Sequence, residues 1–311
     1  METREIRLDG SGARGRKVGG VLLRDLLDVL VVGTQQALRV RTEGRSTARG
    51  SLPGWIAQAS EFRVEIVEGS TVLRLEAPSI WEAAPDHFRQ AELFPELDLH
   101  TPAIDYLTDS LSAALGAEGR SDAYDAPLLE TFRRFQRVFD HGVDQVEFRR
   151  PANGHPEVRL RLARTSLAGL RELERKIPRA QHVRVSGKLD AIRHSDHTFT
   201  LLVGRDRERV RGVTERAEDL RQPWGALVVV SGTAHFTSGG LVQRIEAERI
   251  EDAGDRDLAL FSFAPMPLAR PLSAPDVRKP QGPRSGLNAI FGRWPGEETD
   301  EEIRAVLDEI S

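Results

Sequence analysis

The stretch VRVSGKLDAI at residues 183–192 opens the part of the sequence that decides the fold. Its apolar residues alternate with polar ones around Gly187, a pattern typical of a long, half-buried strand that bends at a glycine. Four more strand patterns follow, at 199–203, 209–214, 226–232 and 241–250. Residues 218–221 can form one helical turn between the third and fourth of the five strands. This order predicts a small five-stranded β-barrel at residues 181–253.

The predicted barrel resembles OB-fold nucleic-acid-binding domains. The resemblance is carried by VSGKL at 185–189, by VVVSGTA at 228–234 and by the order of the strands. It implies a groove in which basic side chains contact the backbone of a single strand and aromatic rings stack on its bases. The residues that could line such a groove are Arg205, Arg207, Arg209, Arg211, Phe199 and Phe236.

A second interpretation of these residues stays open. Residues 181–253 contain 11 Lys and Arg against 11 Asp and Glu, so the arginines can equally form a solvated face paired with acidic neighbours. Phe199 and Phe236 lie in runs that also suit a barrel interior, and Trp224 is the remaining aromatic residue of this segment. Single-stranded nucleic-acid binding is therefore the alternative hypothesis for this chain.

Residues 1–178 predict an α+β region in front of the barrel. The expected helices lie at 21–40, 104–115, 127–139 and 167–176. A short strand is expected at 4–8, and alternating residues predict β-hairpins at 62–75 and 143–162. A helix followed by a hairpin occurs at 21–77 and again at 127–163, an order that suggests a diverged duplication. Residues 42–54 and 78–102 are expected to be irregular.

The composition limits the kinds of site and the location. Of 311 residues, 39% are hydrophobic and 30% are charged, the net charge is −4, and there is no cysteine. The missing cysteines exclude disulfides, thiolate nucleophiles, Fe–S clusters and Cys-based zinc sites. Met1–Arg7 lacks an apolar signal core, and charged residues interrupt the most apolar stretch at 21–32. A cytoplasmic location and no membrane partner are therefore expected.

Two motifs could belong to an enzyme, and neither is complete. GSGARG at 10–15 fits a dinucleotide fingerprint, but no strand with an acidic end follows its helix. His194 and His197 bracket a turn, whereas a metal site needs three or four ligands. We therefore expect no catalytic residue, no metal and no cofactor. An enzyme whose groups are scattered over residues 1–178 is the third hypothesis.

The C-terminal residues change in character after the barrel. Prolines punctuate 254–286, which predicts a semi-extended linker, and residues 287–311 form a tail. Thr299 and Glu302 predict a capping box at the start of a helix of about 12 residues, a length that is marginal in isolation. The apolar side chains expected to bind a partner are Phe291, Trp294, Ile303, Val306, Leu307 and Ile310. Docking of the tail on its own chain is the alternative.

The tail sequence FGRWPGEETDEEI at 291–303 resembles the C-terminal segments of small bacterial antitoxin-like proteins. The resemblance implies a partner of the PIN-domain nuclease toxin class, which such tails wrap and block. The preceding residues do not resemble the usual DNA-binding front end of these antitoxins. The leading hypothesis is thus a non-catalytic, antitoxin-like binding protein that engages a partner protein through residues 287–311.

Overall fold

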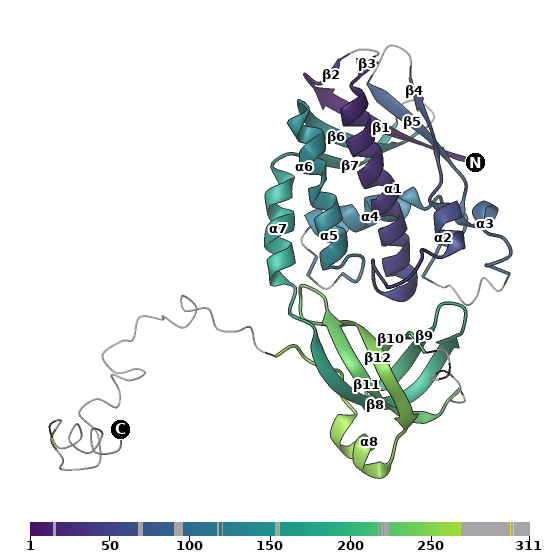
Figure 1. Ribbon diagram of the computed structural model, residues 1–311, viewed down its shortest axis with the longest axis vertical. Coiled ribbons are helices and arrows are strands. Elements are labelled where there is room, and N and C mark those ends of the chain that lie inside the picture. The colour runs from purple at the N-terminus through teal and green to yellow at the C-terminus, as the bar shows by residue number, and fades with distance from the viewer. Residues whose placement is uncertain are drawn as a thin grey trace. The chain divides into compact units, whose positions relative to one another are not determined.

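The computed structural model describes residues 1–14, 17–67, 71–89, 96–116, 118–119, 121–152, 156–216, 218, 220, 224–268, 299 and 301 (Figure 1). The chain divides into two units, Met1–Leu268 and Ala269–Ser311. The six side chains predicted to bind a partner lie outside the described residues, as does most of the predicted linker. The finer domain boundaries at 178 and 253 stay predictions.

An antiparallel five-stranded sheet forms the centre of the N-terminal region. Its order is β4 (Arg63–Ile66), β5 (Val72–Ala77), β1 (Glu2–Gly10), β6 (Val143–Arg150) and β7 (Glu157–Ala163). Both predicted hairpins are confirmed, and each adds to one side of β1, which is longer than the predicted strand at 4–8. Alternation buries Ile6 and Leu8 of β1 on the face that the helices cover. A two-stranded ribbon, β2 (Ala13–Arg14) with β3 (Lys17–Val18), follows β1.

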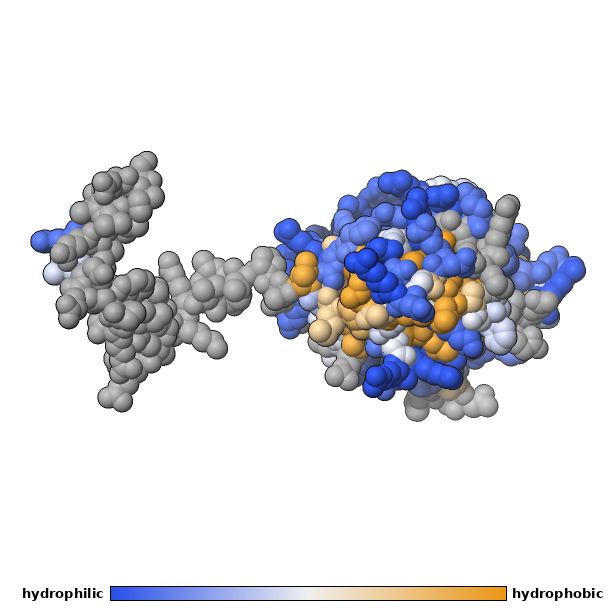
Figure 2. Space-filling view, turned by 90° about the horizontal axis from the view of Figure 1, so that it is seen from below, coloured by the Kyte–Doolittle hydropathy of each residue, from blue (hydrophilic) through white to orange (hydrophobic). Residues whose placement is uncertain are grey.

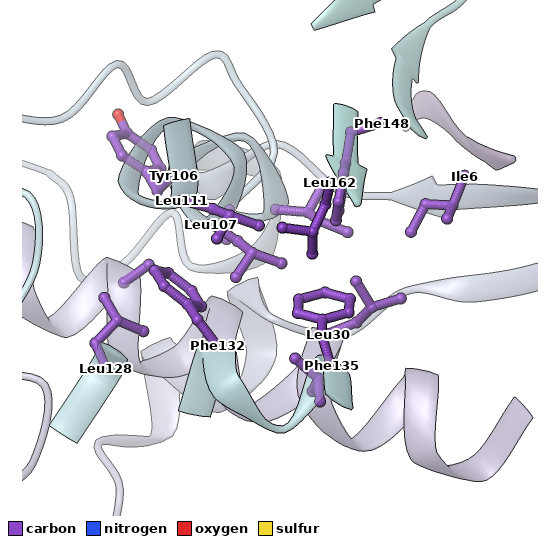
Figure 3. Close-up of a cluster of buried hydrophobic side chains, with 14 of the residues drawn as sticks. Ile6, Leu30, Tyr106, Leu107, Leu111, Leu128, Phe132, Phe135, Phe148 and Leu162 are labelled. Atoms are coloured by element: carbon purple, nitrogen blue, oxygen red, sulfur yellow. The ribbon is translucent and has the colours of Figure 1, made fainter. Parts of the chain in front are cut away.

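Helices supply the other half of this core. They are α1 (Gly20–Glu43), α2 (Gly54–Ala59), α3 (Ile80–Ala83), α4 (Ile104–Leu115), α5 (Ala126–Arg133), α6 (Phe135–Asp140) and α7 (Ser166–Lys176). Figure 3 shows Leu30 of α1, Leu107 of α4 and Phe135 of α6 meeting side chains of the sheet. The helix expected at 127–139 is two helices in the structure, and the irregular segments predicted at 42–54 and 78–102 contain the end of α1 and the short α3.

The long helix α1 ends in a defined way. Gly44 adopts a left-handed conformation with φ 71° and donates its amide to the Val40 carbonyl. A glycine is favoured there because a side chain strains a left-handed backbone. This end of α1 contributes to the site described below.

The predicted barrel is confirmed as a closed, five-stranded structure. The strands are β8 (Gln181–Arg193), β9 (Thr198–Val203), β10 (Glu208–Thr214), β11 (Leu227–Phe236) and β12 (Val242–Asp252). They close in the order β10-β12-β11-β8-β9, and only the β10–β12 pair of these five is parallel. The bend predicted in β8 lets its first half pair with β11 and its second half with β9.

The chain continues past the barrel with a feature that the sequence did not predict. Helix α8 (Asp255–Phe261) lies where the linker was expected to begin. Asp257 accepts a hydrogen bond from the Gly254 amide at 3.1 Å and so stabilises the start of this helix. Among the described residues, no helix has the length and apolar character needed to span a membrane.

Candidate functional site

The two phenylalanines expected to stack on bases lie inside the barrel. Phe199 and Phe236 are 2% and 1% exposed and belong to its apolar core. The Phe199 ring lies across Gly212, where a Cβ atom would overlap it. A base cannot stack on either ring in this fold, so both residues are removed from the candidate interface.

The four predicted arginines do not form one face. Arg205 and Arg207 lie in the exposed turn before β10, and Arg207 has a left-handed φ of 53°. Arg209 points outward from β10, and its guanidinium lies 3.5 Å from the Asp190 carboxylate. Arg211 instead donates from Nη1 to the Arg41 carbonyl oxygen at 3.3 Å. The first three remain available for a ligand, and the fourth is used within the chain.

Arg211 is one of three barrel arginines that hold the C-terminal end of α1. Arg193 donates to the Thr42 carbonyl and Arg244 to the Gly44 carbonyl, each at 2.9 Å. The last carbonyls of a helix lack partners within it, and the helix dipole makes this end negative. Positive side chains therefore stabilise this end of the helix, and these three arginines are occupied by their contacts with α1.

A network of charges surrounds Arg244 in a cleft of about 830 Å³. Arg244 donates to Glu246 at 2.9 Å and lies 3.9 Å from Asp125, the residue that caps α5. His235 Nε2 lies 3.4 Å from a Glu246 carboxylate oxygen. The pKa of Glu246 is lowered to about 2, first by the His235 contact and then by the Arg244 guanidinium, against the opposing effect of burial.

Replacing Glu246 with glutamine should reduce the acid sensitivity of the fold. Because the folded pKa lies near 2 and the ordinary value is 4.5, the ionised carboxylate stabilises the fold above pH 4.5. That contribution is lost as the pH falls through 4.5 towards the folded value. The difference in free energy of unfolding between wild type and Glu246→Gln, measured by urea unfolding, should therefore narrow with falling pH. An equal difference at neutral and acid pH would contradict this, and Glu251→Gln on the same strand is the control.

A second hollow lies on the outer face of β8, β9 and β10 and has a volume of about 570 Å³. Arg209, Arg211 and Thr200 line it from the barrel, and Glu96 and Asp122 line it from the N-terminal region. Arg193 forms a 2.6 Å ion pair with Glu96 at this hollow. The hollow is lined by acidic as well as basic side chains, and Arg193 and Arg211 are already bonded within the chain. An anionic ligand would therefore contact mainly Arg209.

Two residues that the sequence analysis did not select lie beside this face. Trp224 is 73% exposed, and its indole N–H donates to the Asp190 carbonyl at 2.7 Å. The Lys188 ammonium lies 6.0 Å from the centre of that ring. A signal for both residues was present in the sequence, because Trp224 is the third aromatic residue of the segment and Lys188 lies within VSGKL.

Comparisons with known proteins add no assignment to this geometry. No protein-family model, curated protein or solved structure matches the chain. The function is therefore inferred from the residues of the chain itself.

The glycines of the motif that could have indicated a dinucleotide site have a structural role in the described part of the chain. Gly12 donates its amide to the Gly142 carbonyl at 2.8 Å, and a Cβ on Gly10 or Gly12 would overlap the backbone at 141–142. These glycines thus let the end of β1 pack against the turn before β6. The described residues hold no cluster of three His, Asp or Glu side chains suited to a metal ion.

Proposed function

We propose that this chain is a non-catalytic, antitoxin-like binding protein that engages a PIN-domain nuclease toxin through residues 287–311. The likeness of 291–303 to antitoxin tails supports this, as does the assignment of Ala269–Ser311 to a unit of its own. In this proposal the apolar stripe of Ile303, Val306, Leu307 and Ile310 lies in a groove of the toxin, with Phe291 and Trp294 as further anchors.

The observation that carries the proposal is an exposed apolar segment at the end of the unit Met1–Leu268, which precedes the rest of the linker and the tail in the sequence. Phe263, Met266 and Leu268 are 60%, 81% and 80% exposed. The backbone here is nevertheless fixed, because the Gln181 side chain donates to the Met266 carbonyl at 2.7 Å and accepts from the Leu268 amide at 2.9 Å. Exposed apolar side chains on an anchored backbone are typical of a binding surface.

The surface near this segment has the same character. Figure 2 shows apolar residues gathered on the face at the α8 end of the described body, with polar residues around them. The partly exposed apolar residues of this part of the barrel and α8 include Leu227 and Leu260. This face is an exposed apolar surface of the unit Met1–Leu268.

The tail proposal is tested by co-expressing the affinity-tagged chain with the protein encoded beside it, which the proposal expects to be a PIN-domain nuclease. The full chain should recover the partner, and a chain lacking residues 287–311 should recover none. Leu307→Asp should weaken binding by about tenfold or more, because a buried apolar anchor is lost. Val64→Asp, an exposed apolar-to-acid change on β4, is the control. Undiminished recovery with the deleted tail would refute the proposal.

We also propose that the barrel is of OB type and binds single-stranded nucleic acid as a second function. In support, its strands pair in the OB order, with the first strand joined to the second and fourth and the third parallel to the fifth. The favouring observation is the exposed Trp224, with Lys188 6.0 Å from its ring centre and Arg209 beside Asp190, the residue whose carbonyl accepts from the indole. Arg205 and Arg207 are exposed in the turn before β10. The predicted Phe199, Phe236 and Arg211 take no part, for the reasons given above.

A further inference from the structure

Trp224 is largely exposed, and yet its indole is hydrogen-bonded to the barrel. An indole that is 73% exposed gains little from burial, so packing alone does not account for its position. Its ring is nevertheless held, since its N–H donates to the Asp190 carbonyl at 2.7 Å and its neighbour Gly225 donates an amide to the Leu189 carbonyl at 2.9 Å. A ring that is held by a hydrogen bond and is largely open to solvent is suited to stacking.

The strands beside Trp224 present a row of alternating apolar and basic side chains. In the strand register Leu227 lies next to Lys188, Lys188 next to Leu202, and Leu202 next to Arg209. Lys188 and Arg209 are exposed, and Leu202 and Leu227 are partly or largely exposed. The Lys188 ammonium lies 6.0 Å from the Trp224 ring centre, within reach of a cation–π contact.

The acidic residues of this region limit the positive charge without cancelling it. The Asp190 carboxylate faces Arg209 at 3.5 Å, and Asp206 and Glu208 flank the turn before β10. Lys188, Arg205, Arg207 and Arg209 outnumber these three acids by one. Lys188 and Arg209 therefore offer local positive charge near one aromatic ring on a chain whose net charge is −4.

We infer that Trp224 is the stacking platform for one base of a single-stranded nucleic acid, with Lys188 and Arg209 contacting the adjoining phosphates. The inference rests on the second proposed function and replaces the platform that the sequence had assigned to Phe199 and Phe236. One exposed ring and isolated cations suit a single strand, because every base offers a π-face and each phosphate a charge. The ligand class is thus a sequence-tolerant single strand, DNA or RNA.

The test uses the full chain and a fluorescein-labelled oligothymidylate of about 15 nucleotides, followed by anisotropy at about 50 mM and 200 mM NaCl. Trp224→Ala should raise the Kd by about 5- to 150-fold, the range expected for one lost base–aromatic stack. Trp224→Phe should recover part of the loss. Trp81→Ala, which removes another exposed indole on α3, should leave the Kd unchanged.

The salt dependence tests the two cations separately. Lys188→Ala and Arg209→Ala should each reduce the slope of log K against log salt by about 0.7, the value for one phosphate contact on a single strand. Arg175→Ala on α7 is the matched control for an exposed arginine. If the wild type binds and Trp224→Ala binds equally well, Trp224 is not the stacking platform, but the proposal that the barrel binds a single strand stands. No binding by the wild type at the lower salt would overturn both.

Discussion

Replacing Arg244 with alanine should lower the free energy of unfolding by about 3 kcal/mol, the lower end of the range for breaking a buried charge cluster. Arg244 is buried, and it holds the Gly44 carbonyl and the Glu246 carboxylate, with Asp125 3.9 Å away. Its loss leaves the Gly44 carbonyl without this donor and removes the guanidinium that lies beside Glu246 and Asp125. The lower end applies because Glu246 is 39% exposed and water screens it. Urea unfolding of the full chain measures the effect.

The control for this prediction lies on the same strand. Arg249 of β12 is exposed and lies 3.4 Å from Glu251, so Arg249→Ala should change the free energy of unfolding by less than about 1 kcal/mol. A similar loss in both variants would mean that the contact between barrel and α1 contributes nothing beyond a surface pair.

The second large effect is expected from Phe199→Ala, which should cost about 3–5 kcal/mol. The side chain fills the barrel core across Gly212, and its removal leaves a cavity bounded by strands that cannot collapse inward. Leu202→Ala, on the outward face of the same strand, should cost far less. Guanidinium unfolding compares the two. Equal losses would indicate that Phe199 is not a core residue and would restore it as a possible stacking platform.

Local pattern was sufficient for most of the fold. Helix α4 begins and ends where apolar spacing predicted, and the five barrel strands lie within a few residues of their predicted ranges. The break between α5 and α6 was missed because the apolar spacing continues through Arg134. Helix α8 was missed because its seven residues are too few to show a helical repeat of apolar residues, and because the prolines that follow predicted a linker.

The candidate site was harder to predict because its roles depend on distant contacts. Alternation placed Arg209 and Arg211 on one face of β10, but it could not show that the end of α1, 170 residues earlier, would occupy Arg211. Phe199, Leu201 and Val203 occupy alternate positions along β9, so all three side chains point to the same face of the strand, which is the barrel interior. Trp224 lies in a loop, where no period indicates exposure, so only the folded chain identifies it as an open ring.

Residues 287–311 are proposed to be the part of the chain that engages a partner protein. The decisive measurement is amide hydrogen exchange of the full chain, with and without the proposed PIN-domain partner. A helix of about 12 residues is marginal alone, so the partner should slow exchange in 299–311 by an order of magnitude or more. An exchange rate in 299–311 that stays the same when the partner binds would contradict this proposal. So would exchange in 299–311 that, in the chain alone, is already as slow as in the barrel strands.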